Sequence, residues 1–121
     1  GAAAKLPSSL DKQLACEACH AVAEQTTAYV KAKGPRDGRE NAMNAITEEI
    51  CLRPLVYFTK YAYPPPKMKI GCQAILEEYE QQLEELLYGG EDYEGVAARV
   101  CGVPCEGVDR GEAGVGSGPE V

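Results

Sequence analysis

The sequence has little of what catalytic sites usually contain. It has no tryptophan, one phenylalanine and a single histidine, His20, which lies between cysteine-rich and alanine-rich stretches. No Ser-His-Asp arrangement suggests itself around a histidine that follows two cysteines, and the glutamate-rich segment lacks partner carboxylates at a defined spacing. The sequence therefore predicts no catalytic residues, no metal ligands and no cofactor, and we expect a protein that is not an enzyme.

Long apolar runs and basic stripes are also missing. No stretch approaches the roughly 20 apolar residues that span a bilayer. The 19 acidic and 12 basic residues give a net charge of −7, which argues against nucleic acid as a partner. No segment alternates between apolar and polar residues as a strand would. A chain of 121 residues with these features predicts one all-α domain.

Six cysteines are the most informative feature present. They are Cys16, Cys19, Cys51, Cys72, Cys101 and Cys105. An even number in so short a chain indicates a disulfide framework formed in an oxidising compartment. We therefore expect the protein in the secretory pathway, either in the lumen of the endoplasmic reticulum or outside the cell.

Capping residues and prolines divide the first half of the chain into two predicted helices. The first begins at Ser8 or Ser9, with Asp11 in a capping-box-like position, and ends at Gly34-Pro35. The second begins after residue 37 and ends before the proline at 54. Its inward face is expected to carry Ala42, Met43, Ile46 and Ile50.

Two further helices are predicted in the second half. Prolines 64–66 read as an extended connector, and a helix follows over residues 67–88. Its apolar stripe is expected to contain Ile70, Ala74, Ile75, Tyr79, Leu83, Leu86 and Leu87. A short helix over residues 92–101 is expected to bury Val96, Ala97 and Val100.

These segments predict one structured domain with two less ordered ends. The helices and all six cysteines fall within residues 9–105. Residues 1–8 are interpreted as an N-terminal extension. Residues 106–121 are rich in glycine and contain no aromatic residue, which predicts a flexible tail.

Helix phasing selects one disulfide pairing. Cys16 and Cys19 lie three residues apart on the first predicted helix and therefore share a face. Antiparallel packing against the last helix pairs Cys16 with Cys105 and Cys19 with Cys101. A hairpin between the second and third helices pairs Cys51 with Cys72.

Three segments carry a resemblance to a known family. They are LACEACH at residues 14–20, TEEIC at 47–51, and GCQAILEEYEQQLEELLY at 71–88. The cysteine spacing is similar to that of saposin B-type domains, and the glutamate-rich third segment resembles the canopy family over roughly residues 12–105. This resemblance implies a saposin-like bundle of four to five helices with three disulfides. It also implies a non-enzymatic folding helper or adaptor for other proteins in the secretory pathway.

Cys16-x-x-Cys19-His20 also fits three chemical alternatives. The motif matches covalent haem attachment, with Met43 or Met68 as a further iron ligand. It could form a thioredoxin-like redox pair, although no strand precedes it. A zinc site of Cys16, Cys19, Cys101 and Cys105 is a third alternative. The haem and zinc alternatives each leave cysteines unexplained, which favours structural disulfides.

An aromatic cluster beside the prolines is the candidate partner surface. It consists of Tyr57, Phe58, Tyr61 and Tyr63. Tyrosine is favoured where one end of a side chain is apolar and the other is wet. These rings would either contact another protein or close the hairpin between the second and third helices.

Two other functions fit the same scaffold. One is an accessory structural subunit of an extracellular or lumenal assembly. The other is a saposin-like lipid-binding protein, whose contact with a membrane or lipid is possible but not favoured because the apolar stripe is explained by the core.

Overall fold

The computed structural model describes residues 10–37, 46, 49–51 and 63–108. Within these ranges the chain forms helices α1 (Lys12–Asp37), α4 (Pro65–Tyr88) and α5 (Tyr93–Val100), together with turns and no strand. The predicted all-α class is confirmed, and the three disulfides make the bundle consistent with a saposin-like architecture. The predicted extension at 1–8 and most of the predicted tail lie outside the described residues.

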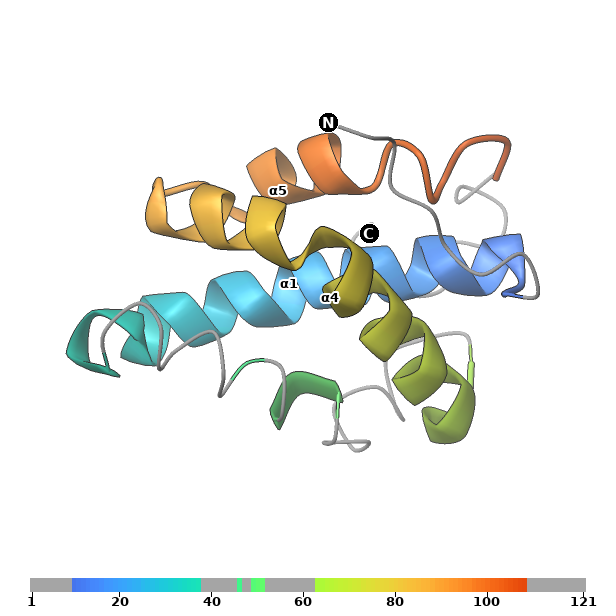
Figure 1. The fold of residues 1–121 in the computed structure, drawn as a ribbon, viewed down its shortest axis with the longest axis horizontal. Helices are drawn as coiled ribbons and strands as arrows, with labels where there is room; N and C mark the ends of the chain where they lie inside the picture. The colour runs from blue at the N-terminus through green and yellow to red at the C-terminus, as the bar shows by residue number, and fades with distance from the viewer. Residues whose placement is uncertain (1–9, 38–45, 47–48, 52–62, 109–121) are drawn as a thin grey trace.

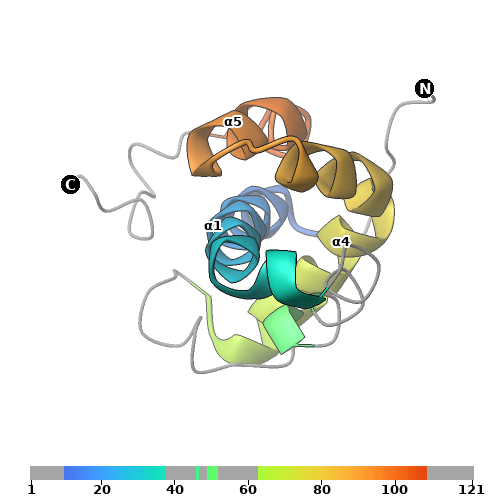
Figure 2. The ribbon, with the colours of Figure 1, turned by 90° about the vertical axis from the view of Figure 1, so that its left-hand side faces the viewer.

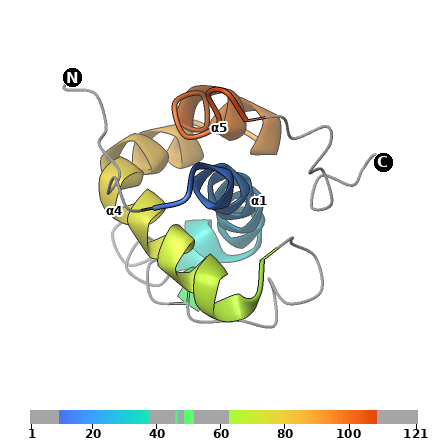
Figure 3. The same ribbon diagram turned by 90° about the vertical axis from the view of Figure 1, so that its right-hand side faces the viewer.

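The α1 helix occupies the middle of the bundle. Seen along its axis, α4 curves around one side of it and α5 lies across another (Figures 2 and 3). In Figure 1, α1 and α5 run in opposite directions, which is the antiparallel arrangement that the cysteine spacing predicts. The core therefore lies around α1, between it and the other two helices.

The first helix begins at Lys12 rather than at Ser8 or Ser9. The side chain of Asp11 accepts a hydrogen bond from the backbone N–H of Leu14 at 3.0 Å. This N–H has no partner within the helix, so an aspartate immediately before the first turn supplies one. Asp11 is therefore the cap itself and not the third residue of an earlier capping box.

The end of α1 also differs from the prediction. The helix continues through Gly34 and Pro35 to Asp37. Proline removes one backbone hydrogen bond, yet its φ is compatible with a helix. Because only two helical residues follow Pro35, the final turn tolerates the loss.

Part of the predicted second helix is described. Ile46 and Ile50 are buried, as predicted, and residues 46 and 49–51 are helical. Cys51 is buried in the same helical turn. The positions predicted for Ala42 and Met43 lie outside the described residues.

The third predicted helix begins inside the proline run. Pro64 is extended, with φ −68° and ψ 161°, and caps α4, whose first residue is Pro65. The first N–H groups of a helix have no intrahelical partner, so proline loses nothing there. The expectation of an extended connector over all three prolines is therefore wrong for Pro65 and Pro66.

The inward face of α4 is shifted near its start. Ile75, Tyr79, Leu83 and Leu87 are buried, as predicted, but Ile70 is 57% exposed. The buried residues in this part of the helix are instead Met68, Gly71 and Cys72. A Cβ placed on Gly71 would lie only 2.7 Å from the Cβ of Ala18, so the glycine lets this face pack closely on α1.

A kink at Tyr79 divides α4. Its φ of −116° and ψ of 15° are not helical, and the ribbon bends in its middle (Figure 1). The bend lets one helix follow the curved surface of α1 and still reach α5, where Gln82 Nε2 donates to the carbonyl of Arg99 at 3.4 Å.

The last helix follows its sequence signals closely. The Asp92 side chain caps α5 by accepting a hydrogen bond from the N–H of Gly95 at 2.9 Å. Val96, Ala97 and Val100 are buried, as predicted. The helix ends at Val100, and turns follow through residue 107.

Candidate functional site

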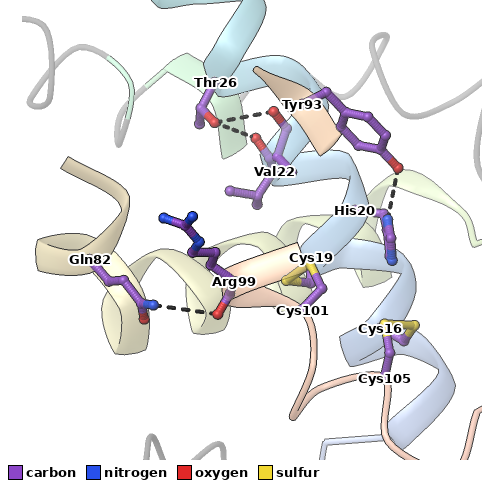
Figure 4. Close-up of a disulfide and its surroundings, with 11 residues drawn as sticks. Cys16, Cys19, His20, Val22, Thr26, Gln82, Tyr93, Arg99, Cys101 and Cys105 are labelled. Carbon is purple, nitrogen blue, oxygen red and sulfur yellow. Dashed lines mark hydrogen bonds between the residues drawn. A yellow bond between two sulfur atoms is a disulfide. The ribbon is translucent and has the colours of Figure 1, made fainter. Parts of the chain in front are cut away.

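Three disulfides join the helices. They are Cys16–Cys105, Cys19–Cys101 and Cys51–Cys72, with Cα–Cα distances of 4.5, 5.7 and 5.5 Å. This is the same pairing that helix phasing predicts, and no cysteine remains free. Figure 4 shows the first two bridges side by side between α1 and the end of α5. In this pairing the C-x-x-C-H sulfurs are unavailable for thioether bonds to haem or for a zinc site.

His20 lies beside the outer of these two bridges. A ring nitrogen of His20 and the two sulfurs of Cys16–Cys105 lie within 4.8 Å of one another. On its other side, Nδ1 of His20 and the hydroxyl of Tyr93 are 2.8 Å apart and share a hydrogen bond (Figure 4). This contact ties α1 to the first residue of α5 and sets the orientation of the imidazole ring.

Only one ring of the predicted aromatic surface is described. Tyr57, Phe58 and Tyr61 lie outside the described residues. The hydroxyl of Tyr63 donates a hydrogen bond to Oδ2 of Asp11 at 3.0 Å. The ring is partly buried against the core, so this tyrosine contributes to closing the fold around the α1 cap.

The environment of Tyr63 favours its neutral form. Partial burial is the main cause that raises the pKa of its hydroxyl, and the hydrogen bond and negative charge of Asp11 raise the pKa further. Ionisation would place a second negative charge beside the carboxylate that caps α1. The phenol thus acts as a stable donor at neutral pH.

A groove lies where the second half of α1 faces the turn between α4 and α5. It has a volume of about 960 Å³. Its lining combines an apolar floor with charged residues around the start of α5. The lining residues are Thr27, Ala28, Val30, Lys31, Ala32, Leu87, Gly90, Glu91, Asp92, Tyr93 and Glu94.

Carboxylates dominate the charge of this groove. Glu91, Asp92 and Glu94 lie on one wall, and Lys31 is the basic residue in the lining. Glu91 is paired with Arg99 at 3.6 Å. The exposed Asp92 and Glu94 therefore give the wall a negative potential, which favours a cationic ligand.

Sequence reasoning missed this groove. The letters EDYE at residues 91–94 indicate a helix start and nothing more, because a capping aspartate and early glutamates are ordinary there. The groove exists only when α1 passes beside that helix start. The part of its lining that α1 supplies, which includes Val30, comes from positions more than 50 residues away in the sequence.

Comparisons with protein families, with curated proteins and with solved structures find no match to this chain. The likeness to canopy proteins consequently rests on the cysteine spacing and the three segments of sequence. Within the part of the chain that the structure describes, no helix is long and apolar enough to cross a membrane.

Proposed function

We propose that the protein is a non-enzymatic interaction protein of the secretory pathway, a canopy-like folding helper or adaptor that binds other proteins through the groove between α1 and α5. The groove is the observation that carries this proposal. It joins an apolar floor to a polar rim, which is the composition of surfaces that bind protein segments.

The charge of the groove defines the kind of partner. Its lining includes carboxylates at residues 91, 92 and 94 together with the apolar residues Val30 and Leu87. A partner segment with both apolar and basic side chains would bury its apolar side chains on the floor of the groove. Its basic side chains would then lie near the acidic wall. We therefore propose a basic amphipathic segment of a client protein as the occupant.

The disulfides support the proposed compartment. Three bridges in a chain of 121 residues are typical of proteins that fold under oxidising conditions. We propose the lumen of the endoplasmic reticulum or the extracellular space. Because all six sulfurs are bonded in these bridges, we propose that surface residues carry the function.

Ala28→Arg tests the groove. Ala28 is exposed and lines the groove, so a long cationic side chain there would fill space and repel a basic ligand. The probe is a fluorescent amphipathic peptide with a leucine face and a lysine face. We expect fluorescence anisotropy to show binding to the wild type that weakens about tenfold or more in the variant, a loss of about 1.4 kcal/mol.

Ala98→Arg is the matched control, because Ala98 is also exposed but lies on α5 outside the groove lining. It should leave the peptide affinity unchanged. A second peptide with glutamate in place of lysine should bind weakly, and added salt should reduce binding of the basic peptide. Equal binding of both peptides, or equal loss in both variants, would contradict the proposal. If the protein co-sediments with lipid vesicles and does not bind the peptide, the lipid-binding alternative would be favoured.

A further inference from the structure

The Cys16–Cys105 bridge differs from the other two in its surroundings. Five of the six cysteines are at most 2% exposed, whereas Cys105 is only partly buried. It is also the bridge beside His20, whose ring nitrogen lies within 4.8 Å of both sulfurs. Disulfides that are accessible and adjoin a basic group are the ones that exchange most readily with thiols.

We propose that Cys16–Cys105 is a thiol–disulfide exchange site, which small thiols open and close while the rest of the fold stays intact. This inference goes beyond the proposed function, because it requires no ligand in the groove. It also differs from a thioredoxin-like pair, since Cys16 and Cys19 are each bonded to a different partner.

The neighbouring bridge explains why opening is tolerated. Cys19–Cys101 joins α1 to the end of α5, and both of its cysteines are buried. Cys105 lies four residues further along, in the turns that follow α5. Opening the outer bridge therefore releases only the segment after Cys101, while the helix pair remains linked.

The difference in exposure between Cys16 and Cys105 determines which sulfur the small thiol attacks. A thiolate of the small thiol attacks Sγ of Cys105, the more accessible residue. The Cys16–Cys105 bond breaks, a mixed disulfide forms at Cys105, and the electron pair leaves on Sγ of Cys16. A second small thiolate then attacks the mixed disulfide, which releases the oxidised small-molecule disulfide and leaves Cys105 as a thiolate. Two thiols are thus oxidised and one bridge is reduced, and the reverse sequence closes it.

His20 assists the first step. It lies one helical turn after Cys16, so a protonated imidazole would stabilise the thiolate that leaves. A leaving thiol with a lower pKa departs faster. The hydrogen bond with Tyr93 keeps the ring beside the sulfurs.

Graded mixtures of reduced and oxidised glutathione test the proposal on the full chain. After each equilibration, free thiols are alkylated and mapped by peptide mass spectrometry. We expect alkylation of Cys16 and Cys105 under conditions in which the other four cysteines remain bonded. Simultaneous opening of all three bridges, or earlier opening of Cys51–Cys72 or Cys19–Cys101, would overturn the proposal.

His20→Gln tests the activating group, with Gln25→Ala as a control at another partly buried position of α1. Loss of the imidazole should slow opening of Cys16–Cys105 by glutathione severalfold, because the thiolate that leaves at Cys16 then lacks a neighbouring cationic group. The control should open at the wild-type rate. An unchanged rate in His20→Gln would contradict the role of His20, and the wild-type mapping tests the site even if this variant does not fold.

Discussion

Gly71 shows how a single residue sets the spacing of two helices. It faces α1 without a side chain, and the nearest atoms to a Cβ at this position would belong to Ala18 and Leu14. Both of these residues are buried in the core. A larger side chain would therefore have to push α4 away from α1, and packed interiors resist such displacement.

Replacing Gly71 with alanine should destabilise the protein. The added methyl group would lie 2.7 Å from the Cβ of Ala18, so we expect overpacking to cost about 1–3 kcal/mol of unfolding free energy. Chemical denaturation followed by circular dichroism measures the change. Gly102→Ala is the control, because a Cβ there meets nothing within 4 Å. Equal stability of the two variants would refute the close approach of the helices.

The same residue marks a limit of sequence reasoning. Helical periodicity placed Ile70 in the apolar stripe, whereas Ile70 is exposed and Gly71 is buried. Periodicity counts apolar side chains, and glycine contributes none. A glycine at a helix–helix contact becomes recognisable only when the partner helix is known.

The stability of helices α1 and α5 depends strongly on the residues that cap their first turns. Asp11 caps α1 and receives a hydrogen bond from Tyr63, so one carboxylate joins the start of α1 to the residue just before the Pro64 cap of α4. Asp92 caps α5. Since α5 has only eight residues, it cannot be stable alone and relies on its cap, its packing and the Cys19–Cys101 bridge.

Loss of the α5 cap should be measurable. Asp92→Ala removes the acceptor of the Gly95 N–H, and we expect a loss of about 1 kcal/mol in unfolding free energy. Thermal unfolding of the oxidised protein provides the measurement. Glu106→Ala, which removes an exposed carboxylate beyond α5, should have a much smaller effect. A cap variant as stable as this control would count against the role of Asp92.

Helix positions were largely predictable, and helix ends were less so. Apolar spacing located α4 and α5, because their buried residues recur each turn. The start of α1 differs from the prediction because Asp11, and not a serine, caps the helix, and its end differs because the helix continues through Gly34 and Pro35. The kink at Tyr79 could not be predicted, because no glycine or proline lies beside it in the sequence.

For the whole molecule, two of the disulfides connect the first helix to the last helix and the turns after it. Two bridges link α1 to residues 101–105, with sequence separations of 82 and 89, and the third links residues 51 and 72. Bridges that close long loops restrict the unfolded chain most, by roughly 3–5 kcal/mol each in the entropic view. A small core without tryptophan gains much from such constraints.

The disulfide pairing could be predicted from the sequence, whereas the groove could not. Cysteine spacing of three on one helix and four around the end of another fixes which sulfurs can meet once the helices run antiparallel. The groove depends on the relative placement of α1 and the turn before α5. No local pattern encodes that placement, because it results from packing across the whole bundle.

Disulfide mapping of the purified protein is the most direct test of the nested pairing that holds the helices together. Proteolysis without reduction, at a pH low enough to prevent exchange, is followed by mass spectrometry of the linked peptides. We expect linkages 16–105, 19–101 and 51–72 and no free thiol. A Cys16–Cys19 linkage, a crossed 16–101 and 19–105 pairing, or a thioether-bound haem on these cysteines would contradict it.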